Sequence, residues 1–197
     1  MPIAPDYQLA NERLYIRPLQ PADAPALHTA AQSLPATPAH LIIFMDRLKS
    51  TVDAAEQFIL AGQQTAALGV RYQLGVFQAD GGNLIGNINV DVHAVLGVNL
   101  GYWCAADMQN KGFMTDALYA LTDHLCHQPE IQRVEVQVTA ENTPSRRVLE
   151  KNGFQFEGTR RNGAVLNGQV LDMHIYAHTP QSWDSFKTMQ KAGLTGI

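Results

Sequence analysis

The 197-residue sequence contains few cysteines and has no excess of positive charge. Its two cysteines, Cys104 and Cys126, form neither a CxxC pair nor a disulfide framework, and their spacing matches no zinc-binding pattern. Lys and Arg total 14 against 18 Asp and Glu, so the formal charge of -4 creates no basic field for nucleic-acid phosphates. We therefore expect no nucleic-acid partner and no metal, and the cysteine content fits a reducing, cytoplasmic setting.

Long apolar runs are also missing. Runs such as Leu41 to Met45 are far shorter than the ~20 residues that a membrane-spanning helix needs, and the N-terminus has neither the basic nor the apolar region of a signal peptide. We therefore expect no membrane partner and a soluble protein. With 46% hydrophobic residues, the chain can bury the core of one ordinary domain.

In the first half of the sequence, the spacing of the apolar residues is helical up to about Leu68 and alternates between apolar and polar from Tyr72 onward. In the helical part, Thr51 is the expected N-cap of the last helix and Gly69 its stop. In the alternating part, Asp80-Gly81-Gly82-Asn83 is typical of a hairpin turn. The predicted elements are a strand at Leu14 to Leu19, helices at Pro21 to Gln32, around Leu41 to Met45 and from Thr51 to Leu68, and strands at Tyr72 to Phe77, Leu84 to Val92 and Val98 to Cys104.

The second half mixes helices and strands and ends in an amphipathic tail. Thr143 is the expected N-cap of the middle helix, and Asn162-Gly163 and Asn167-Gly168 are expected to link the last two strands. The predicted elements are helices from Gly112 to Leu125 and from Pro144 to Asn152, strands at Ile131 to Val138, Phe154 to Arg161 and Gln169 to His178, and a helix after Thr179 with Trp183, Phe186 and Met189 on one side. Together they indicate one mixed α/β domain.

The segment from Gly101 to Thr115 is the most informative part of the sequence. A strand ends, a short loop follows and a helix begins near Gly112, so unpaired backbone N–H groups converge at the positive end of a helix dipole. Such an end binds phosphate, Gly112 permits close approach of a ligand, and Lys111 adds a charge. A polar loop before any helix looks similar, so this segment alone does not identify a phosphate site.

A second segment, from Thr139 to Phe154, follows the first at a spacing that resembles the acyl-CoA site of the GCN5-related N-acetyltransferases (GNAT). Within that superfamily the sequence most resembles the RimJ/RimL type, through Glu12-Arg13-Leu14, Leu84-Ile85-Gly86-Asn87-Ile88, Gly101-Tyr102-Trp103 and Glu157-Gly158-Thr159. The resemblance covers about residues 9 to 178. It implies an α/β (α+β) fold with a mixed, mostly antiparallel sheet that is splayed in the middle and flanked by helices. It also implies one acetyltransferase domain over residues 1–179 and a tail over 180–197 that is expected to be helical.

The resemblance assigns roles to individual residues. In the family, a QxxGxG/A loop holds the CoA pyrophosphate through backbone N–H groups, and Asn142 matches the position that bonds the pantetheine arm. Met114 departs from the small third residue of that loop, which we interpret as a repacked helix start. For Arg147 a contact with the CoA phosphates and a solvated helix face are equally good interpretations. The residues implied for acetyl-CoA binding are Trp103, Cys104, Gln109, Asn110, Lys111, Gly112, Phe113, Met114, Thr115, Asn142, Ser145 and Arg147.

In the reaction of this family, a neutral amine attacks the thioester of acetyl-CoA directly. By analogy, a backbone N–H near Trp103 or Cys104 would polarise the carbonyl, and Ser145 matches the residue that protonates the leaving sulfur. A solvated serine in the first turn of a helix is the alternative interpretation of Ser145. No metal takes part, because His124 and His127 beside Cys126 are better interpreted as exposed histidines.

The general base is the point at which the sequence departs from its relatives. Asn99 and Ala164 stand where many RimL-like chains have a glutamate. Asp91 with His93, and Asp172 with His174, each share one face of a strand and remain as alternatives. A weak base favours an α-amine, with a pKa of about 7.7–8.0, over a lysine amine, with a pKa of about 10.4.

We therefore expect transfer of an acetyl group to the N-terminal α-amine of a protein or peptide, with a ribosomal protein as the partner that the resemblance suggests. Two alternatives remain open. The acceptor can be a small amine such as a polyamine or an aminoglycoside, or the protein can be an impaired CoA-binding sensor. Analogy also suggests a homodimer, through an exposed strand face near the C-terminus or through the apolar stripe of Trp183, Phe186 and Met189.

Overall fold

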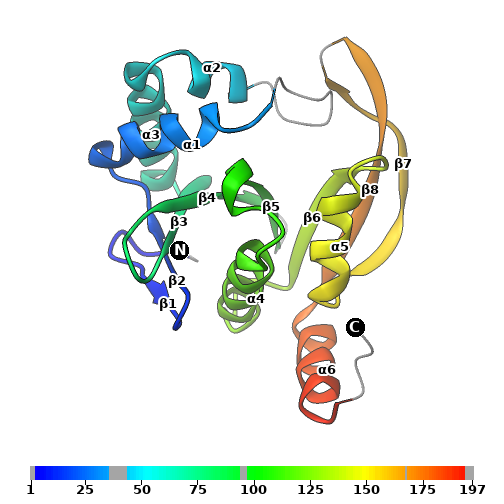
Figure 1. The fold of residues 1–197 in the computed structure, drawn as a ribbon. Coiled ribbons are helices and arrows are strands. Elements are labelled where there is room, and N and C mark those ends of the chain that lie inside the picture. The colour runs from blue at the N-terminus through cyan, green and yellow to red at the C-terminus, as the bar shows by residue number, and fades with distance from the viewer. Residues whose placement is uncertain (1–2, 36–43, 94–96, 167, 194–197) are drawn as a thin grey trace.

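The computed structural model describes residues 3–35, 44–93, 97–166 and 168–193. In chain order the elements are β1 (Leu9–Ala10), β2 (Leu14–Pro18), the 3-10 helix η1 (Pro21–Asp23), α1 (Ala24–Gln32), α2 (Phe44–Ser50), α3 (Val52–Ala67), β3 (Arg71–Gln78), β4 (Leu84–His93), β5 (Gly97–Cys104), the 3-10 helix η2 (Ala106–Met108), α4 (Phe113–Cys126), β6 (Arg133–Thr139), α5 (Thr143–Lys151), β7 (Gln155–Leu166), β8 (Gln169–His178) and α6 (Pro180–Lys191) (Figure 1).

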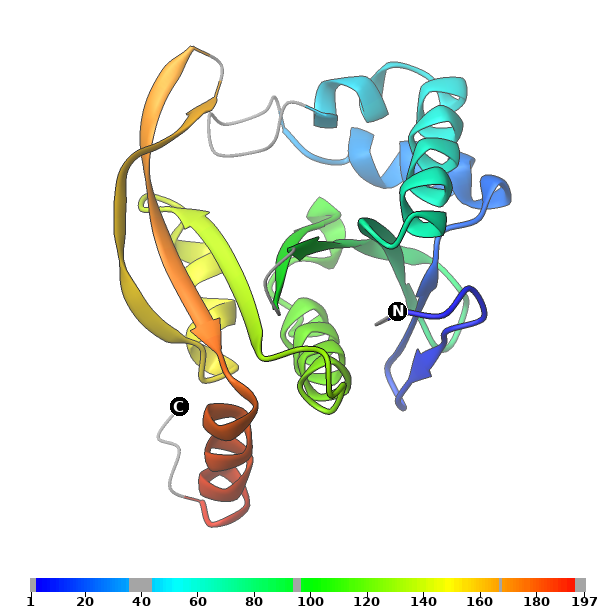
Figure 2. The same cartoon turned by 180° about the vertical axis from the view of Figure 1, so that it is seen from behind.

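One sheet of eight strands connects the two halves of the molecule, in the order β1-β2-β3-β4-β5-β6-β8-β7. Neighbouring strands are antiparallel except β5 and β6, which are parallel. These two strands pair only where Gly97–Asn99 of β5 lies beside Arg133–Glu135 of β6. The remaining parts of the two strands separate. Both views of the ribbon show this divergence (Figures 1 and 2). The predicted fold, a mixed and mostly antiparallel sheet splayed in the middle, is confirmed.

Helices cover opposite faces of the sheet beside the opening. Ile88 and Val90 of β4 belong to the same apolar cluster as Leu118 and Leu121 of α4. The alternating residue Asn89 stands opposite Gln73, which lies against α3, so α3 covers the other face. A second apolar cluster lies between α1 to α3 and the sheet. The two faces of the sheet beside the opening between β5 and β6 therefore carry different sets of helices.

Several local predictions are confirmed at single residues. Thr51 caps α3, because its side chain accepts a hydrogen bond from the Ala54 N–H at 3.0 Å. The hairpin between β3 and β4 turns at Gly81 and Gly82, as the sequence predicts. The apolar run at Leu41 to Met45 lies largely outside the described residues, and its last residue, Met45, is buried. Strand β1 was not predicted, because two residues are too short to show a period.

The predicted N-cap of α5 was wrong by one residue. Asn142 caps the helix by accepting a hydrogen bond from the Ser145 N–H at 3.2 Å, and Thr143 is already helical. An asparagine oxygen serves this purpose as well as a hydroxyl, so the sequence pattern did not distinguish the two. Asn142 is also one of the predicted CoA-binding residues, so its side-chain oxygen is already used by the cap.

The predicted link at Asn162-Gly163 was also wrong. Strand β7 continues through these residues to Leu166, and the register with β8 shifts between Arg160 and Ala164. Asn162 adopts a left-handed conformation, with φ of 52°, and its N–H donates to Asp172 Oδ1 at 2.8 Å. This bulge contains the turn residues without ending the strand.

The tail forms α6 and packs on the domain. Trp183 is fully buried, and its Nε1 donates to Asp123 of α4 at 2.8 Å. Phe186 is also buried, whereas Met189 is exposed. The expected apolar surface of these three residues is therefore wrong, because Trp183 and Phe186 face the core and only Met189 is exposed. The homodimer and the boundary after residue 179 stay predictions.

In the described part of the chain, no helix has the length and the apolar character that a membrane span requires.

Candidate active site

A cleft of about 560 Å³ opens where β5 and β6 separate. Its walls come from α2 and α3, from β3 to β6, from the start of α5 and from β7 and β8. Among the residues predicted for catalysis and binding, Asp91, Asn142 and Ser145 line it. Asn99 and Ala164, which stand at the positions of the expected glutamates, line it as well. The structure therefore brings together residues that lie far apart in the sequence.

Four residues that line this cleft have a buried side-chain oxygen with no hydrogen-bond partner among the described residues: Gln73 Oε1, Asn89 Oδ1, Asn99 Oδ1 and Thr139 Oγ1. The strand register explains the position of the first three. Asn89 stands opposite Gln73, and two positions along the same face Asn99 stands opposite Asp91. We call the side chains of Gln73, Asn89 and Asn99 the carboxamide floor. Leaving such oxygens buried and unpaired costs free energy, which a ligand with N–H groups would recover.

Asp91 faces the cleft, but its expected partner His93 does not. The Asp91 carboxylate forms an ion pair with Arg71, which stands opposite it on β3 and also lines the cleft. His93 is exposed at the end of β4 and is not part of the lining. The two residues share a strand face, as the sequence predicts, but the cleft ends before it reaches His93.

The alternative pair, Asp172 and His174, lies on the wrong face of its strand. Met173, between them, lines the cleft, so its neighbours point to the opposite face. Asp172 accepts the hydrogen bond of the β7 bulge, and the His174 ring packs 5.0 Å from the Phe156 ring. The structure therefore separates this pair from the cleft.

Ser145 is held across the sheet opening by a tyrosine that the sequence analysis gave no separate role. The Tyr102 hydroxyl lies 2.7 Å from Ser145 Oγ and 3.2 Å from the Ser145 carbonyl oxygen. Burial raises the pKa of Tyr102, so its hydroxyl remains protonated at neutral pH. Tyr102 is in the quoted Gly101-Tyr102-Trp103 segment, but no local signal relates it to a residue 43 positions later.

The loop before α4 has the form that the sequence predicts for an anion site. Gly112 is the N-cap of α4 and has φ of 81°, which a residue with a side chain adopts only with strain. Within the described part of the chain, no side chain caps this helix. Asn110 and Lys111 are exposed beside it, and Gln109 Nε2 donates to the Cys104 carbonyl at 3.1 Å. The free N–H groups of the first helical turn are therefore available to phosphate oxygens.

Arg13 clamps this loop, which makes it a functional residue that the sequence analysis missed. Its guanidinium donates to the Lys111 carbonyl oxygen at 2.6 Å and forms an ion pair with Asp116 in the first turn of α4. The same guanidinium lies 4.8 Å from the centre of the Phe113 ring. The segment Glu12-Arg13-Leu14 contributed to the family resemblance, but only the fold brings Arg13 to a loop 98 residues away.

Several predicted CoA-binding residues have buried side chains. Phe113 and Met114 belong to the main apolar cluster, and Trp103 belongs to the second cluster. Cys104 is partly buried, and burial raises the pKa of its thiol to about 11. These four residues can therefore contact a ligand only through their backbone or, for Cys104, through a protonated thiol.

The last two predicted CoA-binding residues lie on α4 and α5. Thr115, in the first turn of α4, uses its carbonyl oxygen to accept from Asn152 Nδ2 at 3.2 Å. Arg147 is exposed on α5, as either of its two interpretations requires.

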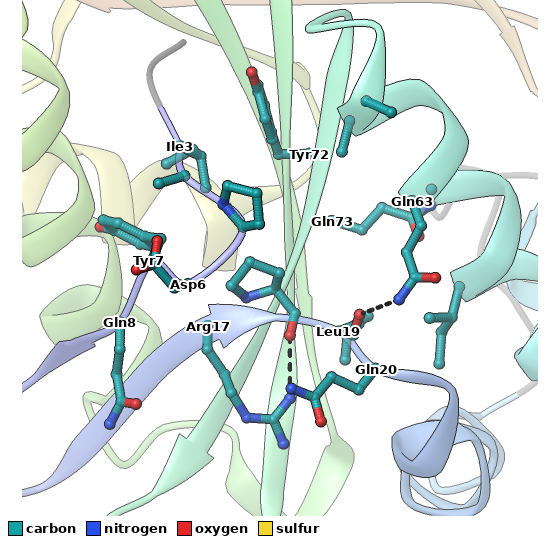
Figure 3. A pocket seen from close by; sticks show the side chains of 17 residues that line it. Ile3, Asp6, Tyr7, Gln8, Arg17, Leu19, Gln20, Gln63, Tyr72 and Gln73 are labelled. Atoms are coloured by element: carbon teal, nitrogen blue, oxygen red, sulfur yellow. Dashed lines mark hydrogen bonds between the residues drawn. The ribbon is translucent and has the colours of Figure 1, made fainter.

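A second cavity, of about 480 Å³, lies on the other side of α3 (Figure 3). Its wall includes Arg17, which donates to the Pro18 carbonyl at 3.1 Å, and Gln63, which donates to the Leu19 carbonyl at 3.5 Å. None of the predicted site residues lines it. It shares only Gly62 and Gln73 with the first cleft.

Gly62 of α3 lies directly against the Gln73 side chain of β3. A Cβ atom on Gly62 would lie 2.0 Å from Gln73 Oε1, so a larger residue there would force the flexible Gln73 amide to move. Gly62 thereby allows the Gln73 amide to lie flat in the carboxamide floor.

Comparison with known families places the chain among acetyl-transferring proteins. The family described as acetyltransferase (GNAT) domain matches residues 13–155. This range includes every residue predicted for the site, the Arg13 clamp and the carboxamide floor.

Two curated proteins illustrate the range of similarity. The probable N-acetyltransferase YjcK of Bacillus subtilis strain 168 is 29% identical over 173 residues, which cover 86% of this chain and 95% of that protein. The ribosomal-protein-serine acetyltransferase of Escherichia coli strain K12 is 32% identical over 78 residues, which cover 40% of this chain and 44% of that protein. The ribosomal-protein enzyme is thus a distant relative that matches over less than half of its length.

Solved structures show the same fold. A RimL ribosomal-protein acetyltransferase in complex with coenzyme A superimposes with a TM-score of 0.80 at 20% identity, over 88% of this chain and 98% of that one. RimJ of Mycobacterium smegmatis, in complex with a CoA disulfide, gives a TM-score of 0.80 at 23% identity, over 96% of this chain and 95% of that one.

Proposed function

The chain belongs to the GNAT acetyltransferase family and is an acetyl-CoA-dependent N-acetyltransferase, and we propose that its acceptor is the α-amine of a peptide or protein. One observation carries this proposal: the carboxamide floor, whose three buried oxygens have no hydrogen-bond partner among the described residues, lines the cleft beside the opening of the sheet. Acetyl-CoA supplies an acetyl thioester, whose carbonyl carbon the amine attacks. The ribosomal-protein acetyltransferases among the relatives support a protein acceptor by analogy.

The residues that would hold acetyl-CoA come from the start of α4, the end of β5 and the N-cap of α5. The free N–H groups at Phe113 to Thr115 would bind the pyrophosphate, with Gly112 allowing its close approach. Beyond Asn99, strand β5 does not pair with β6, so a backbone N–H group near Trp103 or Cys104 would bind the acetyl-pantetheine arm and polarise its carbonyl. Asn142 would contribute its amide N–H group, because its oxygen already caps α5.

Neutral carboxamides favour an acceptor that is already partly deprotonated. An oxygen without formal charge binds an N–H group but stabilises an ammonium ion less than a carboxylate does. An α-amine, with a pKa of about 7.7–8.0, is partly neutral near pH 7.4, whereas a lysine amine, at about 10.4, is almost fully charged. The corresponding difference in barrier is roughly 3 kcal/mol. The floor therefore suits α-amines better than lysines.

Asp91 would accept the proton of the amine, and Ser145 would donate a proton to the leaving group. Asp91 uses Oδ1 in its ion pair with Arg71, which leaves Oδ2 to accept the proton of the attacking amine, directly or through water. Ser145 Oγ would donate a proton to the departing sulfur and would regain one from water, while the Tyr102 hydroxyl holds it in position. His93 has no part in this proposal, since it lies outside the cleft.

Release of free thiol from acetyl-CoA at pH 7.5 tests the proposal. Peptides with a free or a blocked N-terminus, an internal-lysine peptide, polyamines and aminoglycosides serve as acceptors, and Ser145→Ala serves as the control variant. We expect turnover with free N-termini that falls in the variant. Faster turnover with internal lysine or with a polyamine would contradict the α-amine proposal. Tight CoA binding without turnover for any amine would favour the sensor role.

A further inference from the structure

The charged side chains that line the active cleft are Arg47, Arg71 and Asp91. Arg71 and Asp91 form an ion pair and neutralise each other. Arg47 lies on α2, is exposed, and has no carboxylate within ion-pair distance among the residues that the structure describes. The cleft therefore carries one uncompensated positive charge, although the whole chain has a formal charge of -4.

The two kinds of binding group lie on different walls of the cleft. The carboxamide floor belongs to β3, β4 and β5, whereas Arg47 comes from α2, beside the α3 residues that cover the floor. The floor provides oxygens that accept hydrogen bonds from N–H groups. Arg47 provides only donors and a permanent positive charge, which suit a carboxylate or a phosphate. A ligand complementary to both walls has an amine at one end and an anion at the other.

We infer that the acceptor carries an anionic group close to its amine, and that Arg47 binds this group. This inference deepens the proposed function and rests on it. The amine reaches the carboxamide floor and the sheet opening, while the anion stays at the mouth of the cleft. We expect polyamines and aminoglycosides to be poor acceptors, because the positive charge of Arg47 repels their additional ammonium groups.

One chemistry, an amine with a nearby carboxylate, has two sources. A free amino acid supplies its own α-carboxylate, and a peptide supplies an acidic side chain next to its N-terminus. Two matched pairs of acceptors separate these sources: a free amino acid against its amide, and a peptide amide with glutamate against one with glutamine at the second position. Each pair differs in one negative charge and little in shape.

The experiment measures kcat/KM for both pairs with the wild type, Arg47→Gln and Arg47→Glu. We expect the wild type to prefer the anionic member of one pair about tenfold, which corresponds to about 1.4 kcal/mol. Arg47→Gln removes this preference and Arg47→Glu reverses it, with CoA affinity unchanged. Lys191→Gln removes one positive charge at the end of α6, outside the cleft, and should keep the preference.

Equal rates for the anionic and neutral members of both pairs would overturn the inference and leave the proposed function intact. If no amine is acetylated, the proposed function fails, and the charge preference is measured as equilibrium binding of the same four compounds to the CoA-bound protein. Equal affinities for the anionic and neutral members of both pairs would then overturn the inference as well. So would a preference for the anionic member that Arg47→Gln retains.

Discussion

The Tyr102 hydroxyl lies 2.7 Å from Ser145 Oγ and joins β5 to the first turn of α5, across the gap that opens in the sheet. Through this contact, a side chain of one half of the molecule positions the proposed proton donor on the other half. Because burial raises the pKa of Tyr102, the phenol remains a donor at the pH at which an α-amine is partly neutral.

Ser145→Ala should lower kcat by about a hundredfold, the lower end of the range for general acid catalysis, without changing CoA affinity. Tyr102→Phe should have a smaller effect in the same direction, because Ser145 keeps its hydroxyl but loses its partner. Steady-state rates with acetyl-CoA and with an acetyl thioester of a more acidic thiol provide the measurement. The acidic thiol leaves without a proton, so the better leaving group should restore much of the loss. Equal losses with both thioesters would argue against proton donation.

Arg13→Gln should weaken CoA binding about threefold to tenfold, because the Lys111 carbonyl loses its donor and Asp116 loses its ion-pair partner. The loop before α4 then samples conformations that do not present its N–H groups. Isothermal titration with CoA measures the change. Glu12→Gln alters the neighbouring exposed residue and serves as the matched control. Unchanged CoA affinity in Arg13→Gln would show that the loop holds its shape without the clamp.

Gly62→Ala should reduce kcat/KM for the amine while leaving the thermal midpoint unchanged or higher. Alanine favours the α3 helix by up to about 1 kcal/mol over glycine, but its Cβ must displace the Gln73 amide from the carboxamide floor. A double-mutant cycle with Gln73→Ala isolates this cause. Once Gln73 is truncated, Gly62→Ala should have no further effect on kcat/KM. Additive losses would mean that Gly62 acts through another contact.

Asp91→Asn should lower kcat for the amine at least tenfold, since the carboxylate that faces the cleft can no longer take a proton. His93→Gln, two residues along the same strand face, should leave kcat unchanged because His93 is exposed outside the cleft. Rates at saturating acetyl-CoA compare the two variants. A larger loss in His93→Gln than in Asp91→Asn would exchange the two assignments.

Stability should fall as the pH drops below the ordinary pKa of histidine, 6.5, because burial lowers the pKa of His178. Below pH 6.5 the unfolded chain binds a proton at His178, whereas the folded protein does so only at a lower pH. The contribution of neutral His178 to the free energy of unfolding is therefore complete above pH 6.5 and is lost on acidification. Its slope is at most about 1.4 kcal/mol per pH unit. Urea unfolding between pH 7.5 and 5 measures it. His178→Phe should be less stable but should show a flatter pH dependence over this range.

Local patterns predicted most of the elements, because their causes lie within a few residues. Thr51 caps α3 through a hydrogen bond three residues away, and the hairpin before β4 follows from its glycines. The same local reasoning failed where two outcomes share one signal. Asn162-Gly163 is as typical of a bulge as of a turn, and Asn142 and Thr143 are both good N-caps, so long-range register and packing made the choice.

The sequence by itself determined the family and the fold class, and it predicted the two segments that we propose for CoA binding, because these depend on motifs that are continuous along the chain. Only the tertiary structure decided which side chains share the cleft. Strand register placed Gln73 opposite Asn89 and Asp91 opposite Asn99, and the sheet opening brought Tyr102 to Ser145. Tertiary packing also brought Arg13 to the loop before α4, where it contacts the Lys111 carbonyl oxygen. Such contacts join residues whose separation along the chain carries no signal, since they form only when packing of the whole domain fixes the strands in space.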